Sequence, residues 1–141
     1  MTDRRWVVGL WALALLGAAG PAGAWGLEGL RAVRIEVAAE QADPVDCEVE
    51  LLEALRDAGI APSPDVRERL RLDVVPVEGG WSAGLLVIQP LCLERDPLRC
   101  ADQPTWIEVI ADRAAESPLP LVRGVAERFV AAWSQANPEA P

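Results

Sequence analysis

The sequence of 141 residues contains no lysine, histidine or tyrosine, and all 13 of its basic residues are arginine. Without histidine the chain cannot build a Ser-His-Asp or Cys-His catalytic site, or a histidine metal site. Without lysine it cannot form a Schiff base or a P-loop. These absences leave carboxylates, arginines and three cysteines for chemistry. We therefore expect a protein that is not an enzyme and that holds no cofactor.

The usual metal and phosphate motifs are missing as well. The cysteines form no C-x-x-C pair, which argues against a thioredoxin-type or zinc-ribbon site. Gly79-Gly80 is typical of a turn between two strands and not of a phosphate loop. An acidic stretch could offer oxygens to Ca²⁺, but it lacks a D-x-D-x-D-G loop and fits a helix start, where the dipole favours carboxylates. We expect no metal there; its acids are Glu40, Asp43, Asp46, Glu48, Glu50 and Glu53.

The first 24 residues have the order of a secretory signal. Arg4 and Arg5 form a short basic start, and residues 6–19 are an apolar run without charge. Paired arginines are also part of a twin-arginine signal, but the rest of that motif is weak here. We therefore expect export to the periplasm or beyond, with the general secretory route and the twin-arginine route both open.

Small residues mark a cleavage site at the end of this segment. Pro21 breaks any helix, and Ala22 and Ala24 supply the small side chains at positions −3 and −1, so cleavage is expected before Trp25. The alternative is an uncleaved anchor in the inner membrane, because the apolar stretch approaches the roughly 20 residues that span a bilayer. No cysteine follows the site, so nothing supports lipoprotein processing.

Residues 25–141 are expected to form a single domain with a strongly acidic charge. Of 22 acids and 13 arginines, the signal removes Asp3, Arg4 and Arg5, which leaves 21 and 11, a net charge of −10. This charge disfavours nucleic acid and anionic membrane surfaces as partners. It gives no information on the oligomeric state.

Hydrophobic periodicity predicts four strands, at residues 30–38, 69–77, 81–93 and 105–112. The third is apolar on both faces around residues 85–88 and should be central in the sheet. Residues 94–104, with their Asp96-Pro97 turn signal, are expected to form a loop.

Two helices complete the pattern. The first is expected from Asp43-Pro44 to Gly59, which provide an N-cap, a first-turn proline and a C-terminal glycine. Its buried stripe is predicted as Val49, Leu52 and Leu55, with Leu51 and Ala58 beside it. The last helix should run from Ser117-Pro118 to Asn137-Pro138 and bury Val122, Val125, Phe129 and Trp133.

The order β-α-β-β-β-α predicts an α+β two-layer sandwich. We expect a mostly antiparallel four-stranded sheet with both helices on one face, and the first strand joined through the helix crossover. Trp81, Trp106 and Trp133 are spaced as core residues of this fold, although they could also stack on a sugar or a peptide.

The cysteines suggest one disulfide and one thiol. If the third and fourth strands pair, Cys92 and Cys100 come close enough for a bridge, which an oxidising compartment would preserve. Cys47 is then left without a disulfide partner in the first turn of a helix, where the dipole could lower its pKa and make it reactive. Cys47 could equally be buried, or pair with one of the other two.

Local phrases of the sequence resemble a loose group of small exported bacterial proteins of unknown function. The phrases are residues 53–60, Thr105-Trp106, residues 129–133 and Asn137-Pro138. At the level of the fold, the chain resembles the N-terminal domain of the periplasmic TolB protein and related envelope-assembly domains. The resemblance implies a small α+β envelope domain and transfers no site residue.

Three functions remain open. The first is a non-enzymatic module that binds a protein partner in the cell envelope, with strand addition at a sheet edge as one route. The second is a small-ligand or metal-binding periplasmic protein, which would require a cleft with convergent polar groups. The third is a thiol-dependent enzyme that uses an exposed Cys47.

Overall fold

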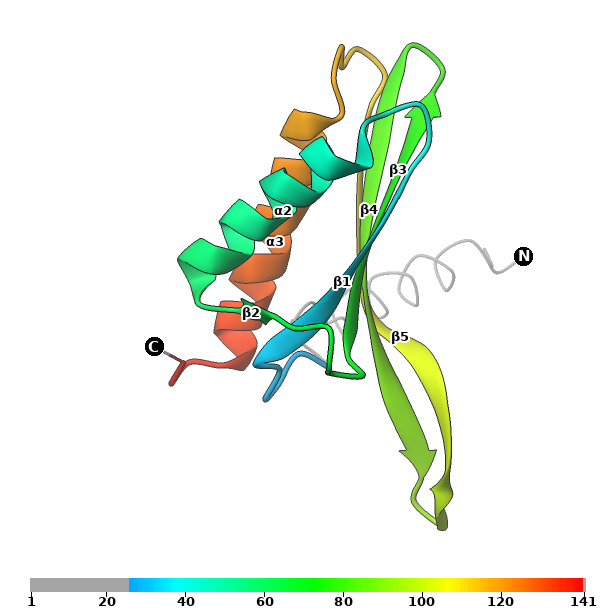
Figure 1. The fold of residues 1–141 in the computed structure, drawn as a ribbon, viewed down its shortest axis with the longest axis vertical. Helices are drawn as coiled ribbons and strands as arrows, with labels where there is room; N and C mark the ends of the chain where they lie inside the picture. Colours follow the sequence, from blue (N-terminus) through cyan, green and yellow to red (C-terminus); the bar gives the residue numbers. More distant parts are fainter. Residues whose placement is uncertain (1–25, 141) are drawn as a thin grey trace, which may run out of the picture.

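The fold is described by a computed structural model over residues 26–140 (Figure 1). The predicted signal and its cleavage residues Ala22, Ala24 and Trp25 lie outside this range. Within it, no helix combines the length and the apolarity needed to cross a membrane. The elements in chain order are β1 (Ala32–Ala39), α2 (Pro44–Ala58), β2 (Ala61–Pro62), β3 (Arg69–Val77), β4 (Gly80–Leu93), β5 (Asp96–Asp112) and α3 (Leu119–Ala136).

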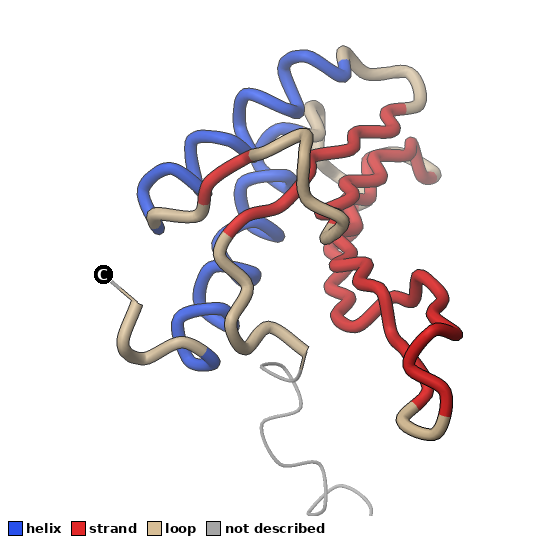
Figure 2. The backbone as a smooth tube through the Cα atoms, turned by 60° about the horizontal axis from the view of Figure 1, so that its bottom comes forward, coloured by secondary structure: helices blue, strands red, loops and turns tan. Residues whose placement is uncertain are grey.

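The strands form one mixed sheet in the order β2-β1-β3-β4-β5. β1 lies parallel to β2 and β3, whereas β3, β4 and β5 form an antiparallel meander. Both helices cover one face and leave the other bare, which Figures 1 and 2 show from two directions.

The predicted α+β fold with two helices on one face is confirmed, but the four-stranded, mostly antiparallel sheet is wrong in detail. The crossover through α2 returns the chain in its original direction, so β1 and β3 run parallel. β2 adds a fifth strand of only two residues beside β1, too short to produce a periodic signal.

The core fills the space between the sheet and the helices. Alternate residues in the middle of β3 and β4 are buried there, and Phe129 of α3 meets Trp106 of β5 edge-on, with ring centroids 5.4 Å apart. The predicted stripe of α3 is buried throughout, and Trp81, Trp106 and Trp133 all belong to the core or pack against it. The predicted stripe of α2 is right in part: Leu51 and Leu55 are buried together with Cys47, whereas Val49 is 49% exposed.

Side chains at the C-terminal end of α3 form hydrogen bonds with the backbone of residues 27–30, which precede β1. Asn137 accepts a hydrogen bond from the Gly29 N–H at 2.8 Å and donates one to the Leu27 carbonyl at 2.9 Å. The indole N–H of Trp133 donates to the Leu30 carbonyl at 2.7 Å. Asn137 is therefore more than the predicted end of a helix, because it satisfies backbone groups more than a hundred residues away.

Candidate functional site at the β5 edge

β5 lies at the end of the sheet and has a strand neighbour on one side only. Of the strands between residues 26 and 140, it pairs with β4 alone. Residues 105–112 of β5, called the β5 edge below, continue beside the core. An edge of this kind presents backbone donors and acceptors in the spacing that a further strand requires.

The composition of the β5 edge is that of an interior strand. Trp106 and Ile110 face the helices, and the alternating residues Ile107 and Val109 face the bare side of the sheet. These two side chains are 56% and 58% exposed. Strands that are apolar on both faces normally lie inside a sheet with both faces covered. The β5 edge therefore has the side chains of a covered strand in an uncovered position.

Two of the exposed apolar side chains lie next to each other on the β5 edge. Among the described residues, eight large hydrophobic side chains are exposed, and two of them, Val45 and Val49, belong to α2. The other six belong to β3, β4 and β5: Val75, Leu91, Leu93, Leu98, Ile107 and Val109. Scattered exposed apolar residues are common, but Ile107 and Val109 lie together on an unpaired strand, where they can contribute to an interaction surface.

Charges and irregular backbone protect only the ends of the β5 edge. From Thr105 to Ala111 the one charged residue is Glu108, and it pairs with Arg128 of α3 at 2.6 Å. A bulge occurs at Thr105, because Val87 is opposite Trp106 while Ile88 is opposite Pro104. Proline, bulges and charge are the usual means of blocking edge pairing, and the middle of this edge carries only one neutralised charge.

β4 and β5 continue beyond the end of β3 as a two-stranded ribbon. β3 pairs with β4 as far as Ile88, and residues 89–103, called the arm below, project past it (Figure 1). The predicted loop at residues 94–104 is therefore wrong, since β5 begins at Asp96. Its prolines and polar residues are typical of loops, but pairing with β4 overrides that local preference.

A disulfide and an ionic network fix the arm. The predicted bridge between Cys92 and Cys100 is present and links its two strands. On the outer face, Asp102 pairs with Arg69 at 3.4 Å and with Arg67 at 3.8 Å. Each exposed pair contributes little alone, but the network links the arm to β3.

Cys47 lies in the core and not at the surface. The structure leaves it as a free cysteine, fully buried under the first turn of α2. Burial raises the pKa of its thiol, and the nearby carboxylates Asp46 and Asp43 raise the pKa further. The expectation of a lowered pKa at the helix start is wrong, because desolvation and these two charges oppose the helix dipole.

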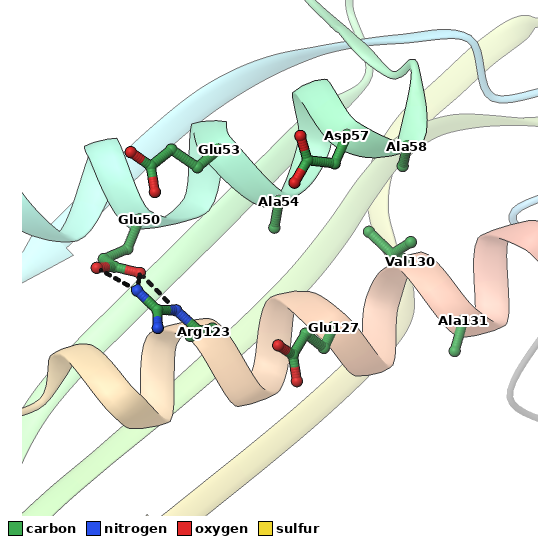
Figure 3. A pocket seen from close by; sticks show the side chains of 9 residues that line it. All are labelled: Glu50, Glu53, Ala54, Asp57, Ala58, Arg123, Glu127, Val130 and Ala131. Carbon is green, nitrogen blue, oxygen red and sulfur yellow. Dashed lines mark hydrogen bonds and ion pairs between the residues drawn. The ribbon is translucent and has the colours of Figure 1, made fainter.

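The acidic stretch is distributed around α2 instead of converging on one point. Glu50 accepts three hydrogen bonds from Arg123 of α3, one from Nε at 3.0 Å and two from Nη2 at 2.9 and 2.8 Å, which raise the pKa of the arginine. Glu50 and Glu53 line a groove of about 520 Å³ between the two helices (Figure 3). Within residues 26–140, no three acidic, cysteine or histidine side chains gather into a metal site.

The comparisons with known proteins leave the family open. No protein-family model matches the chain. No curated protein matches it in sequence. Among solved structures, it is similar to a minor lipoprotein from Acinetobacter baumannii, with a TM-score of 0.35 and 14% identity over 79% of this chain and 97% of that one. A likeness this distant carries no argument about function, and the resemblance to TolB and to small exported proteins stays a prediction.

Proposed function

We propose that this protein is an exported, non-enzymatic module that binds a protein partner in the cell envelope through the β5 edge. One observation carries the proposal: a strand with the composition of an interior strand lies at the edge of the sheet. A partner strand that continued the sheet would pair the backbone of β5, and its neighbouring residues would cover Ile107 and Val109.

Two features support export. Residues 1–24 have the pattern of a secretory signal, and the chain carries the Cys92–Cys100 disulfide, a bond that persists in oxidising compartments. The absence of histidine, lysine and tyrosine from the sequence supports a role in binding. The buried Cys47 argues against a thiol-dependent enzyme, which would need an exposed sulfur.

Photo-crosslinking in cells that export the protein tests the proposal. A photoreactive residue at position 109 is compared with one at position 45, an equally apolar and exposed position on α2. We expect a discrete protein adduct from position 109 that disappears with Ile107→Glu, and none from position 45. Equal adducts from both positions, or none from position 109, would contradict binding at the β5 edge. Intact mass of the periplasmic protein, expected to begin at Trp25, tests export separately.

A further inference from the structure

Charge along β5 indicates the chemistry of the partner. This strand contains the acids Asp96, Asp102, Glu108 and Asp112 and one arginine, Arg99. Asp102 and Glu108 are paired with arginines outside β5, so Asp96 and Asp112 are the acids of this strand without an arginine partner among residues 26–140. β4 contributes no charged residue at all. The whole chain carries −9, which adds a long-range attraction for cationic segments.

The acids are distributed along β5 with apolar residues between two of them. Asp112 closes the β5 edge, and its carboxylate accepts a hydrogen bond from the Ala114 N–H at 2.8 Å without an arginine partner in residues 26–140. Asp102 lies just beyond the other end, where it is shared between two arginines. Between them, Ile107 and Val109 face the bare side of the sheet. A strand that matches this surface is apolar at alternating central positions and basic at the end beside Asp112.

We infer that the β5 edge binds an extended basic segment of another protein, about seven residues long, with lysine or arginine at the end beside Asp112 and alternating apolar residues along the rest. The inference rests on the proposed function and adds the partner's chemistry to it. The segment continues the sheet through backbone hydrogen bonds beside β5. Its apolar side chains cover Ile107 and Val109, and its terminal cation lies beside Asp112.

A second copy of this chain fits the edge poorly. Each copy carries a net charge of −9, so two copies repel each other as they approach. The antiparallel register that sets Ile107 opposite Val109 also sets Glu108, paired with Arg128, opposite its own copy. Repulsion between the two acidic chains therefore makes self-pairing the disfavoured arrangement.

Two capped peptides of equal length and opposite end charge test this inference. The probes are Lys-Val-Thr-Val-Thr-Val-Lys and Glu-Val-Thr-Val-Thr-Val-Glu, titrated into the protein purified after export and followed by its backbone amide NMR signals. At low salt we expect the Lys peptide to shift the signals of residues 105–112, with an affinity about tenfold or more above that of the Glu peptide. The preference should shrink as salt is raised to about 0.3 M.

Variants locate the interaction. Ile107→Glu should abolish the shifts, and Val45→Glu, an equal change on α2, should leave them intact. Asp112→Asn should reduce the preference for the Lys peptide without unfolding the sheet, which the amide spectrum itself reports.

Each outcome separates the two proposals. Equal binding of both peptides at residues 105–112 would overturn the basic partner and leave the β5 edge as the binding surface. Failure of both peptides to bind there at millimolar concentration would overturn strand addition as well. Shifts from the Lys peptide confined to the groove lined by Glu50 and Glu53 would overturn the inference, because the peptide would then bind to acidic side chains between the helices and not to the β5 edge. A concentration-dependent dimer that excludes the peptides would assign the edge to a second copy.

Discussion

Replacement of Asn137 by alanine tests the link between the end of α3 and the residues before β1. The side chain is 6% exposed and satisfies the Gly29 N–H and the Leu27 carbonyl. Two of its partners keep another donor in the variant: the Leu27 carbonyl also accepts from the Leu30 N–H at 3.3 Å, and the Trp133 carbonyl from the backbone N–H of Asn137 at 3.0 Å. The variant therefore leaves one backbone group, the Gly29 N–H, without a partner.

Each buried polar group that loses its partner costs about 1–3 kcal/mol, and an exposed residue such as Gly29 can regain water. We therefore expect Asn137→Ala to lower the free energy of unfolding by about 1–2 kcal/mol, the net worth of the side-chain hydrogen bonds that it removes. For a domain of this size, that corresponds to a decrease in Tm of roughly 4–8 °C.

Urea denaturation measures the loss, with Gln135→Ala as the matched control because it removes an exposed side chain from the same helix. The control should change the free energy by less than about 0.5 kcal/mol. Hydrogen exchange should accelerate at the Gly29 amide in the variant. A loss for Asn137→Ala no greater than that of the control would refute the reasoning, since it would mean that the side-chain hydrogen bonds of Asn137 add nothing to stability.

Three further predictions follow from the same structure. Serine at both Cys92 and Cys100 should accelerate amide exchange in the arm, by an amount equivalent to about 2–3 kcal/mol for so short a loop; a core Tm lowered to the same extent would show instead that the arm unfolds with the core. Stability should change little from about pH 6 to pH 9, where a chain without histidine, lysine or tyrosine has few groups to titrate. The native pKa of Cys47 is raised above its usual value of 9.0, so the neutral thiol contributes fully to the free energy of unfolding below pH 9.0. This contribution is lost as pH rises through the native pKa, by at most about 1.4 kcal/mol per pH unit. Urea melts of Cys47→Ala should lack this alkaline loss of stability, and an unchanged loss would assign it to another group. Phe129→Ala should cost about 3–5 kcal/mol in urea melts, because the ring is fully buried, and a cost under about 1 kcal/mol would mean that the core collapses around the gap.

The strands and helices could be predicted where a local signal decided the structure. Asp43 does accept a hydrogen bond from the Val45 N–H at 2.8 Å, and Gly59 does end α2 with a positive φ of 77°. The stripe of α3 was predictable because its apolar residues follow one helical period. In α2, apolar residues lie on more than one side, so periodicity alone did not determine which side is buried.

Non-local pairing decided what could not be predicted. The arm forms from prolines and charged residues that favour a loop, and its strands exist because β4 and the disulfide hold them. The position of β5 at the edge of the sheet could not be predicted either, because strand order depends on which segments meet in space. Apolar residues on both faces of residues 105–112 were visible in the sequence, but this pattern becomes informative only once β5 is known to lie at the edge.

The contacts of Asn137 and Trp133 also tie the two ends of the described chain together. The Leu27 and Leu30 carbonyls and the Gly29 N–H find their partners more than a hundred residues later, in the side chains of Trp133 and Asn137. Residues 27–30 therefore reach their native hydrogen bonds only through a contact that closes a very long loop, which is the kind of contact that slows folding.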